Sequence, residues 1–186
     1  MAKNEPEKIR VSKLDAARRQ LDCAIELWFA EKDDVSTHTL AAAAHQIIHD
    51  INKKRGGRDL FFDSIVIKDE YRAEFVALVK RDMNFFKHAD KDVEGITEFI
   101  PLGSIMFMLF STIGLQQLGE RLNDVEDTFI LWLTFHHPNW INEAYRKKIE
   151  QTVPVQHLDD IRGLNKQEFF TGFLRARAEL RAKGLV

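Results

Sequence analysis

The stretch SKLDAARRQLDCAIELW, residues 12–28, decides the fold class. Its apolar residues recur at steps of three and four, the spacing of one face of an α-helix: Leu14, Ala17, Leu21, Ala24, Ile25 and Trp28. Ser12, followed three residues later by Asp15, resembles a capping box at a helix start. We therefore predict a helix over residues 13–30.

The helical period continues along most of the chain. It predicts further helices from a Ser36 cap to before Gly56, over residues 69–88, from a Ser104 cap to residue 118, over 125–135, over 140–152, and from an Asn165 cap to Gly184. The apolar runs within residues 58–68 are ambiguous, and we expect mostly loop there. Strand signals are few, which predicts an all-α protein, a single helical bundle of six or seven helices. We expect residues 1–11 to form a flexible N-terminus and residues 12–186 to form one α-helical domain.

Composition narrows the function classes. The 27 Lys and Arg against 29 Asp and Glu give a formal charge of -2, so nucleic-acid binding is not implied by overall charge. Cys23 is the only cysteine, which excludes an internal disulfide and predicts a reducing compartment. The apolar run 105–118 is too short to span a bilayer, so we expect a cytoplasmic protein without a membrane partner.

Cofactor-binding motifs are missing from the sequence. It has no phosphate-cradling glycine loop, no zinc-type cysteine pairs, no G-x-S-x-G elbow and no dinucleotide fingerprint. We therefore expect no cofactor, and specifically no dinucleotide.

A polar line crosses the third predicted helix. Arg81, Asn84 and His88 stand at positions i, i+3 and i+7, which places them on one helix face. A guanidinium stays charged and matches two phosphate oxygens with its fork of donors, whereas an imidazole exchanges a proton near neutral pH. Their alignment suggests a phosphate-binding and acid–base pair. The alternative is that Arg81 pairs with Asp82 or Glu74 at the surface and that His88 is favoured by the helix C-terminal dipole.

An arginine, six residues and then a histidine, with the polar Asp82 directly after the arginine, resembles the signature of the HEPN superfamily. The resemblance covers a possible core of residues 12–95, followed by a helical extension over 97–186. It implies a compact α-helical bundle and metal-independent ribonuclease activity. Arg81 would hold the scissile phosphate, His88 would transfer protons at the ribose 2′-OH, and Asp82 and Asn84 would support them. It also implies a homodimer that acts on RNA, either as this ribonuclease or as a protein that binds RNA or a nucleotide phosphate.

A histidine line crosses the second predicted helix. His38, His45 and His49 share one face, and the last two have the i, i+4 spacing that lets two imidazoles reach one metal ion. We place this line opposite a predicted core stripe of Leu40, Ala44, Ile47 and Ile51. An alternative site would therefore hold a metal through His45, His49 and Glu74, with Glu26 and His88 as further candidates. No Glu-x-x-His spacing supports a di-metal bundle.

Another interpretation of the function stays open. The chain could be a non-catalytic helical interaction module whose exposed Phe and Trp residues meet a partner.

The single cysteine is not predicted to be catalytic. Cys23 has no neighbouring histidine in sequence, so we expect an unreactive thiol.

Overall fold

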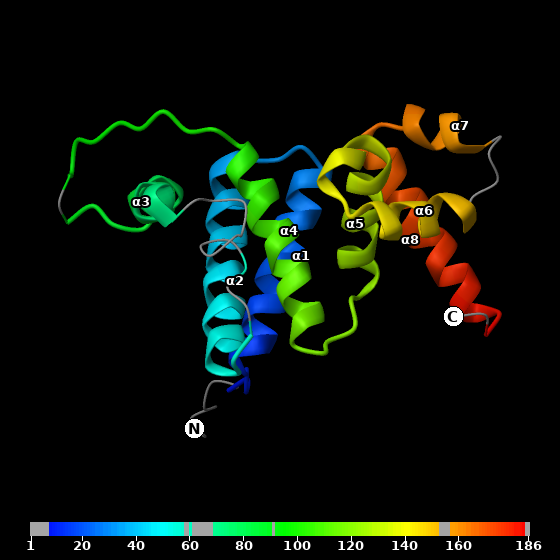
Figure 1. The fold of residues 1–186 in the computed structure, drawn as a ribbon, viewed down its shortest axis with the longest axis horizontal. Helices are drawn as coiled ribbons and strands as arrows, with labels where there is room; N and C mark the ends of the chain where they lie inside the picture. The colour runs from blue at the N-terminus through cyan, green and yellow to red at the C-terminus, as the bar shows by residue number, and fades with distance from the viewer. Residues whose placement is uncertain (1–7, 58–59, 61–68, 91, 153–156, 185–186) are drawn as a thin grey trace, which may run out of the picture.

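The computed structural model describes residues 8–57, 60, 69–90, 92–152 and 157–184. Within these ranges the prediction of an all-α protein is confirmed, with eight α-helices, one short 3₁₀ helix and no strand. The helices are α1 (Lys13–Phe29), α2 (Asp34–Lys54), α3 (Asp69–Phe85), α4 (Leu102–Gln117), α5 (Asp124–His136), η1 (Pro138–Trp140), α6 (Glu143–Thr152), α7 (Leu158–Gly163) and α8 (Lys166–Ala182) (Figure 1). The count exceeds six or seven because the six-residue α7 carries too little periodicity to be predicted. None of these helices combines the length and the apolar character needed to cross a bilayer.

Two predicted helix caps are confirmed. The Ser12 hydroxyl accepts a hydrogen bond from the Asp15 backbone N–H at 3.0 Å, and the Asp15 carboxylate accepts one from the Ser12 N–H. Asn165 and Glu168 form the same reciprocal box at the start of α8. Each box satisfies backbone donors that would otherwise lack a partner at the helix start.

Two other predicted caps are wrong. Asp33, not Ser36, caps α2, because its carboxylate accepts the Ser36 N–H at 2.7 Å and α2 begins at Asp34. Likewise α4 begins at Leu102 after Pro101, without a side-chain cap. Ser104 is instead buried inside α4, and its hydroxyl lies 3.1 Å from Nδ1 of His38.

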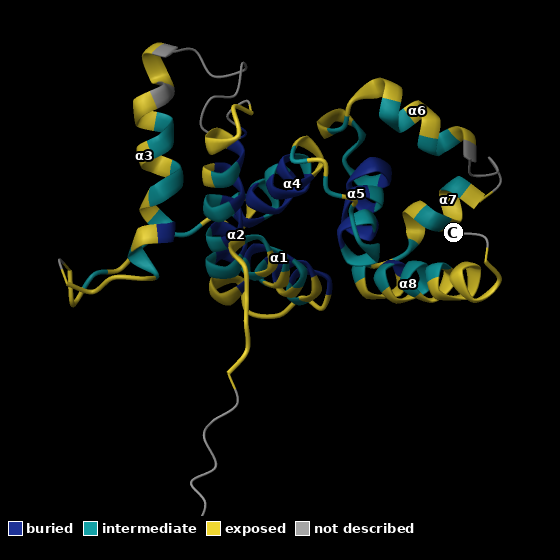
Figure 2. Ribbon diagram, turned by 90° about the horizontal axis from the view of Figure 1, so that it is seen from below, coloured by how far each residue is buried: buried dark blue, intermediate teal, exposed yellow. Residues whose placement is uncertain are grey.

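Helix α2 packs against both α1 and α4, with which it makes its most extensive contacts (Figures 1 and 2). Small residues allow this close packing, because Ala41, Ala42 and Ala44 are all fully buried. On α4, a Cβ added at Gly114 would stand only 2.5 Å from Ile48 of α2.

The predicted core stripe of α2 is largely wrong. His38, His45 and His49 are 2%, 1% and 7% exposed, whereas Leu40, Ile47 and Ile51 are only half-buried; Ala44 is buried as predicted. The histidine line therefore faces the interior. These histidines are buried because their rings pack against aromatic rings from other parts of the chain. The His45 ring lies 5.4 Å from the Phe107 ring of α4, and three phenylalanine rings surround His38.

An aromatic cluster joins α1 to α5 and α8. The ring of Trp28 meets those of Phe129 and Trp132 edge-on at 5.6 and 6.1 Å, and Phe169 meets Trp132 edge-on at 5.1 Å. Such edge-to-face pairs are favourable beyond the area they bury.

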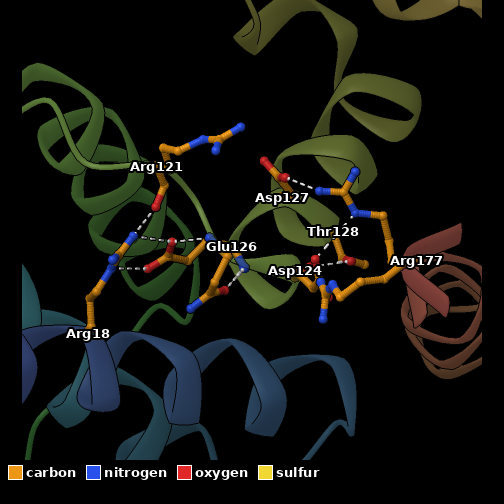
Figure 3. A network of polar contacts seen from close by, with 9 residues as sticks. Arg18, Arg121, Asp124, Glu126, Asp127, Thr128 and Arg177 are labelled. Atoms are coloured by element: carbon orange, nitrogen blue, oxygen red, sulfur yellow. Dashed lines mark hydrogen bonds and ion pairs between the residues drawn. The ribbon is translucent and has the colours of Figure 1, made fainter. Parts of the chain in front are cut away.

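A polar network also joins α5 to α1 and α8 (Figure 3). Arg18 of α1 donates hydrogen bonds to both carboxylate oxygens of Glu126 on α5 and to the Arg121 carbonyl. In the same first turn of α5, Asp124 and Asp127 pair with Arg177 of α8. Burial raises the pKa of Glu126, and this effect is opposed by the Asn123 N–H and by the charge of Arg18. Polar and aromatic contacts together fix α5 against α1.

Helix α3 lies at the edge of the molecule beside α2 (Figures 1 and 2). The residues that connect it to α4 fold back onto α2, because the Phe86 and Phe99 rings lie 5.7 and 4.8 Å from the His38 ring. These contacts and the buried Met83 hold α3 in place. The predicted loop over residues 58–68 lies outside the described residues except for Leu60, which is buried.

Candidate functional site

Arg81, Asn84 and His88 line one cavity at the C-terminal end of α3. Its volume is about 590 Å³, and Phe85, Asp90 and Asp92 complete its wall. All three side chains of the predicted line are exposed, so a ligand can reach them from solvent. The helical spacing that aligned them in the sequence therefore also gathers them in space.

Arg81 is held from two sides. Its Nε donates to Asp82 Oδ1 at 2.9 Å, and its Nη2 donates to the Glu98 carbonyl at 3.1 Å. The hydrogen bond to Asp82 is the main reason that the pKa of Arg81 is raised, so the guanidinium stays charged. These bonds fix the plane of the guanidinium while its side chain remains 52% exposed.

Asp82 is a positioning residue and does not line the cavity. Its side chain is only 14% exposed, and its Oδ1 also accepts a hydrogen bond from the Thr97 hydroxyl at 3.2 Å. The Arg81–Asp82 pair that the surface interpretation predicted is therefore present. Because that pair leaves Arg81 at the wall of the cavity, the pair and a ligand-binding role are compatible.

His88 follows the last turn of α3. Its backbone N–H donates to the Asn84 carbonyl at 3.1 Å, which extends the helical path beyond Phe85 and carries the imidazole to the cavity. The ring itself makes no hydrogen bond to another residue in the described part of the chain. An exposed imidazole that makes no hydrogen bond to the described residues is accessible for proton exchange with a ligand.

Carboxylates modify the charge of the cavity. Asp90 and Asp92 lie at its wall and oppose the positive charge of Arg81. Among the described residues that line it, the site therefore offers one oriented guanidinium, one imidazole and one amide to an anionic ligand.

The histidine line does not form an exposed site. Burial lowers the pKa of His45 to about 3 and also lowers that of His38, so both rings are neutral at neutral pH. Glu26 and Glu74 are exposed, whereas the histidines of the line are buried. Among residues 8–57, 60, 69–90, 92–152 and 157–184, no group of three or more His, Cys, Asp or Glu side chains is placed to hold a metal ion.

Several residues of the site were missed in the sequence. Thr97 and the Glu98 carbonyl come from the segment that connects α3 to α4, and no local pattern links that segment to α3. Asp90 and Asp92 carry a weak signal, because they follow His88 directly in a charged run. Cys23 is exposed, in agreement with its predicted place off the core stripe.

Comparison with known proteins gives no relative: no family model, no curated protein and no solved structure matches the chain.

Proposed function

We propose that the protein is a metal-independent endoribonuclease that resembles the HEPN superfamily. In this proposal Arg81 binds the scissile phosphate, Asn84 donates a further hydrogen bond, and His88 transfers protons at the ribose 2′-OH. The observation that supports it is the convergence of Arg81, Asn84 and His88 on one exposed cavity.

The state of each group supports this assignment of roles. Arg81 remains protonated and is oriented by Asp82, so little ordering is needed when a phosphate binds. The imidazole of His88 has an ordinary exposed setting, and proton transfer by such a group contributes about 10²- to 10⁴-fold to a rate.

The carboxylates restrict how the ligand binds. Asp90 and Asp92 disfavour several phosphates at once, so we expect Arg81 to contact a single phosphodiester. Neutralising one phosphate of a single strand gives a logarithmic salt slope of about -0.7. A shallow salt dependence is therefore expected for RNA binding.

The test is cleavage of a single-stranded RNA and a stem–loop RNA by the full chain in the presence of EDTA. We expect the wild type to cut, and the variants Arg81→Ala and His88→Ala to lose at least about 10²-fold in rate. Arg19→Ala and His157→Ala are matched controls, because both residues are exposed and lie outside the cavity. Absence of cleavage by the wild type, or equal cleavage by all four variants, would contradict the proposal.

A second candidate function is protein binding, favoured by the connection between α3 and α4. There Val93, Ile96 and Ile100 are 78%, 96% and 71% exposed. We expected such a surface to consist of exposed Phe and Trp residues. Among the described residues the exposed large apolar side chains are mostly aliphatic and include no phenylalanine, whereas Trp140 is 39% exposed.

A further inference from the structure

The connection between α3 and α4 presents an apolar and acidic ridge, formed by residues 92–100. Its side chains alternate over residues 96–100: Ile96, Glu98 and Ile100 are exposed, whereas Thr97 and Phe99 turn inward. The Thr97 hydroxyl donates a hydrogen bond to Asp82, and the Phe99 ring packs on the His38 ring. These two contacts anchor the ridge to α3 and α2. Its exposed apolar residues are therefore a fixed feature of the surface.

Exposed apolar side chains that are gathered in one segment are unfavourable in water and are typical of a binding surface. Asp92, Glu94 and Glu98 stand among them and are also exposed. The partner must therefore be apolar and basic, so that it buries the isoleucines and pairs with the carboxylates.

The chain itself contains a segment that is both apolar and basic. Residues 8–12, the arm, read Lys-Ile-Arg-Val-Ser, so basic and apolar side chains alternate. Ile9 and Val11 are 74% and 42% exposed, and Lys8 and Arg10 are exposed as well. The arm runs away from the helices (Figure 2).

The arm and the ridge lie toward opposite ends of α2 (Figure 1). Lys13, just after the arm, shares a cavity with Ile51 and Lys54 near the end of α2. Ser104, just after the ridge, contacts His38 near its start. Sixteen helical residues separate His38 from Lys54 and span about 24 Å, whereas a five-residue arm reaches at most about 18 Å. The contact must therefore form between copies.

We propose that the arm of one copy docks on the ridge of a second copy, pairing Lys8 and Arg10 with Glu94 and Glu98 and covering Ile96 and Ile100 with Ile9 and Val11. This contact is independent of the proposed ribonuclease activity, because it needs no residue that touches RNA.

The test is sedimentation velocity of the full chain over a range of concentrations, without RNA. We expect the wild type to self-associate, more weakly at high salt. The arm variant Lys8→Glu/Arg10→Glu and the ridge variant Glu94→Lys/Glu98→Lys should each raise the dissociation constant by at least about tenfold, because like charges then face each other. Arg175→Glu/Lys183→Glu, at exposed positions of the C-terminal region, changes the net charge as the arm variant does and should leave association unchanged.

Charge exchange makes the test specific. An equimolar mixture of the arm and ridge variants pairs acidic arms with basic ridges, and basic arms with acidic ridges, so association should return. The fourfold variant should likewise associate with itself. A wild type that stays monomeric at every concentration overturns the proposal. So does a wild type whose association the charge reversals leave unchanged, or a mixture that does not recover; these outcomes leave the ribonuclease proposal untouched.

Discussion

Arg18 on α1 donates from Nε and Nη2 to the two carboxylate oxygens of Glu126 on α5, at 3.3 and 3.2 Å. Glu126 is fully buried, and its Oε2 also accepts the Asn123 N–H at 2.8 Å. One carboxylate therefore closes the N-terminal cap of α5 and joins that helix to α1. Removing one partner of such an ion pair destabilises the folded protein, because the charge of the other partner stays buried without compensation.

Removing the guanidinium should destabilise the protein strongly. We expect Arg18→Ala to lower the free energy of unfolding by about 3 kcal/mol, since Glu126 then lacks its charged partner. The neighbouring Arg19 is exposed and outside this network, so Arg19→Ala should change stability by less than about 0.5 kcal/mol. Urea unfolding followed by circular dichroism measures both. Equal stabilities for the two variants would show that the Arg18–Glu126 pair contributes little.

The buried His45 predicts an acid-dependent loss of stability. Its pKa falls from 6.5 to about 3 on folding, mainly through burial. Above pH 6.5 the ring is neutral in both states, and below it the unfolded chain binds a proton that the folded protein excludes. Stability should therefore fall as the pH drops from 6.5 toward 3, by about 2 kcal/mol at pH 5 from this group alone.

A variant isolates that contribution. In His45→Gln the titrating group is absent, so the stability curve between pH 6.5 and 4 should be flatter than that of the wild type. His157→Gln, at an exposed position, should keep the wild-type slope. Identical slopes for wild type and His45→Gln would refute the assignment.

Gly114 predicts an exception to helix propensity. Alanine at an exposed helical glycine stabilises a helix by up to about 1 kcal/mol, but here the new Cβ would lie 2.5 Å from side-chain atoms of Ile48 and Leu60. We expect Gly114→Ala to destabilise by about 1–3 kcal/mol. Gly172 in α8 has nothing within 4 Å of such a Cβ, so Gly172→Ala should not destabilise. Thermal melting measures the stability of both variants. A stabilised Gly114→Ala would show that α2 and α4 pack less closely than the structure indicates.

Asp90 and Asp92 should weaken RNA binding. In water, a carboxylate repels a phosphate at a separation of about 8 Å by about 0.5 kcal/mol, and the cavity wall carries two carboxylates. The variant Asp90→Asn/Asp92→Asn should therefore bind a short RNA about fivefold more tightly at low salt, as measured by fluorescence anisotropy. Asp159→Asn, on α7, serves as the control and should bind as the wild type does. An unchanged or weaker affinity of the double variant would argue against a phosphate in this cavity.

Local signals in the sequence predicted the helices well and their environments less well. Ser12 and Asn165 cap helices because the reciprocal partner stands three residues away, which sequence alone reveals. The burial of His38 and His45 depends on Phe99 and Phe107, more than fifty residues later, and no local period encodes that contact.

In the candidate site, too, residues on one helix could be predicted from the sequence, whereas contacts from a distant segment could not. Arg81, Asn84 and His88 were found because one helical path aligns them. The Glu98 carbonyl and Thr97, which fix Arg81 and Asp82, come from a connection without periodicity. The sequence therefore predicted the candidate residues on α3 and their neighbour Asp82, but not the contacts from residues 97 and 98 that hold Arg81 and Asp82 in place.

The most direct test of the proposed function is the chemistry of the RNA ends produced in EDTA. If His88 acts at the ribose 2′-OH, the 2′-oxygen bonds to phosphorus as the bond to the 5′-oxygen breaks and that oxygen takes a proton. Mass spectrometry should then find 2′,3′-cyclic phosphate and 5′-hydroxyl ends, and a 2′-deoxy substitution at the scissile position should block cleavage. Products with 5′-phosphate ends, cleavage of the 2′-deoxy substrate, or no cleavage would contradict the account.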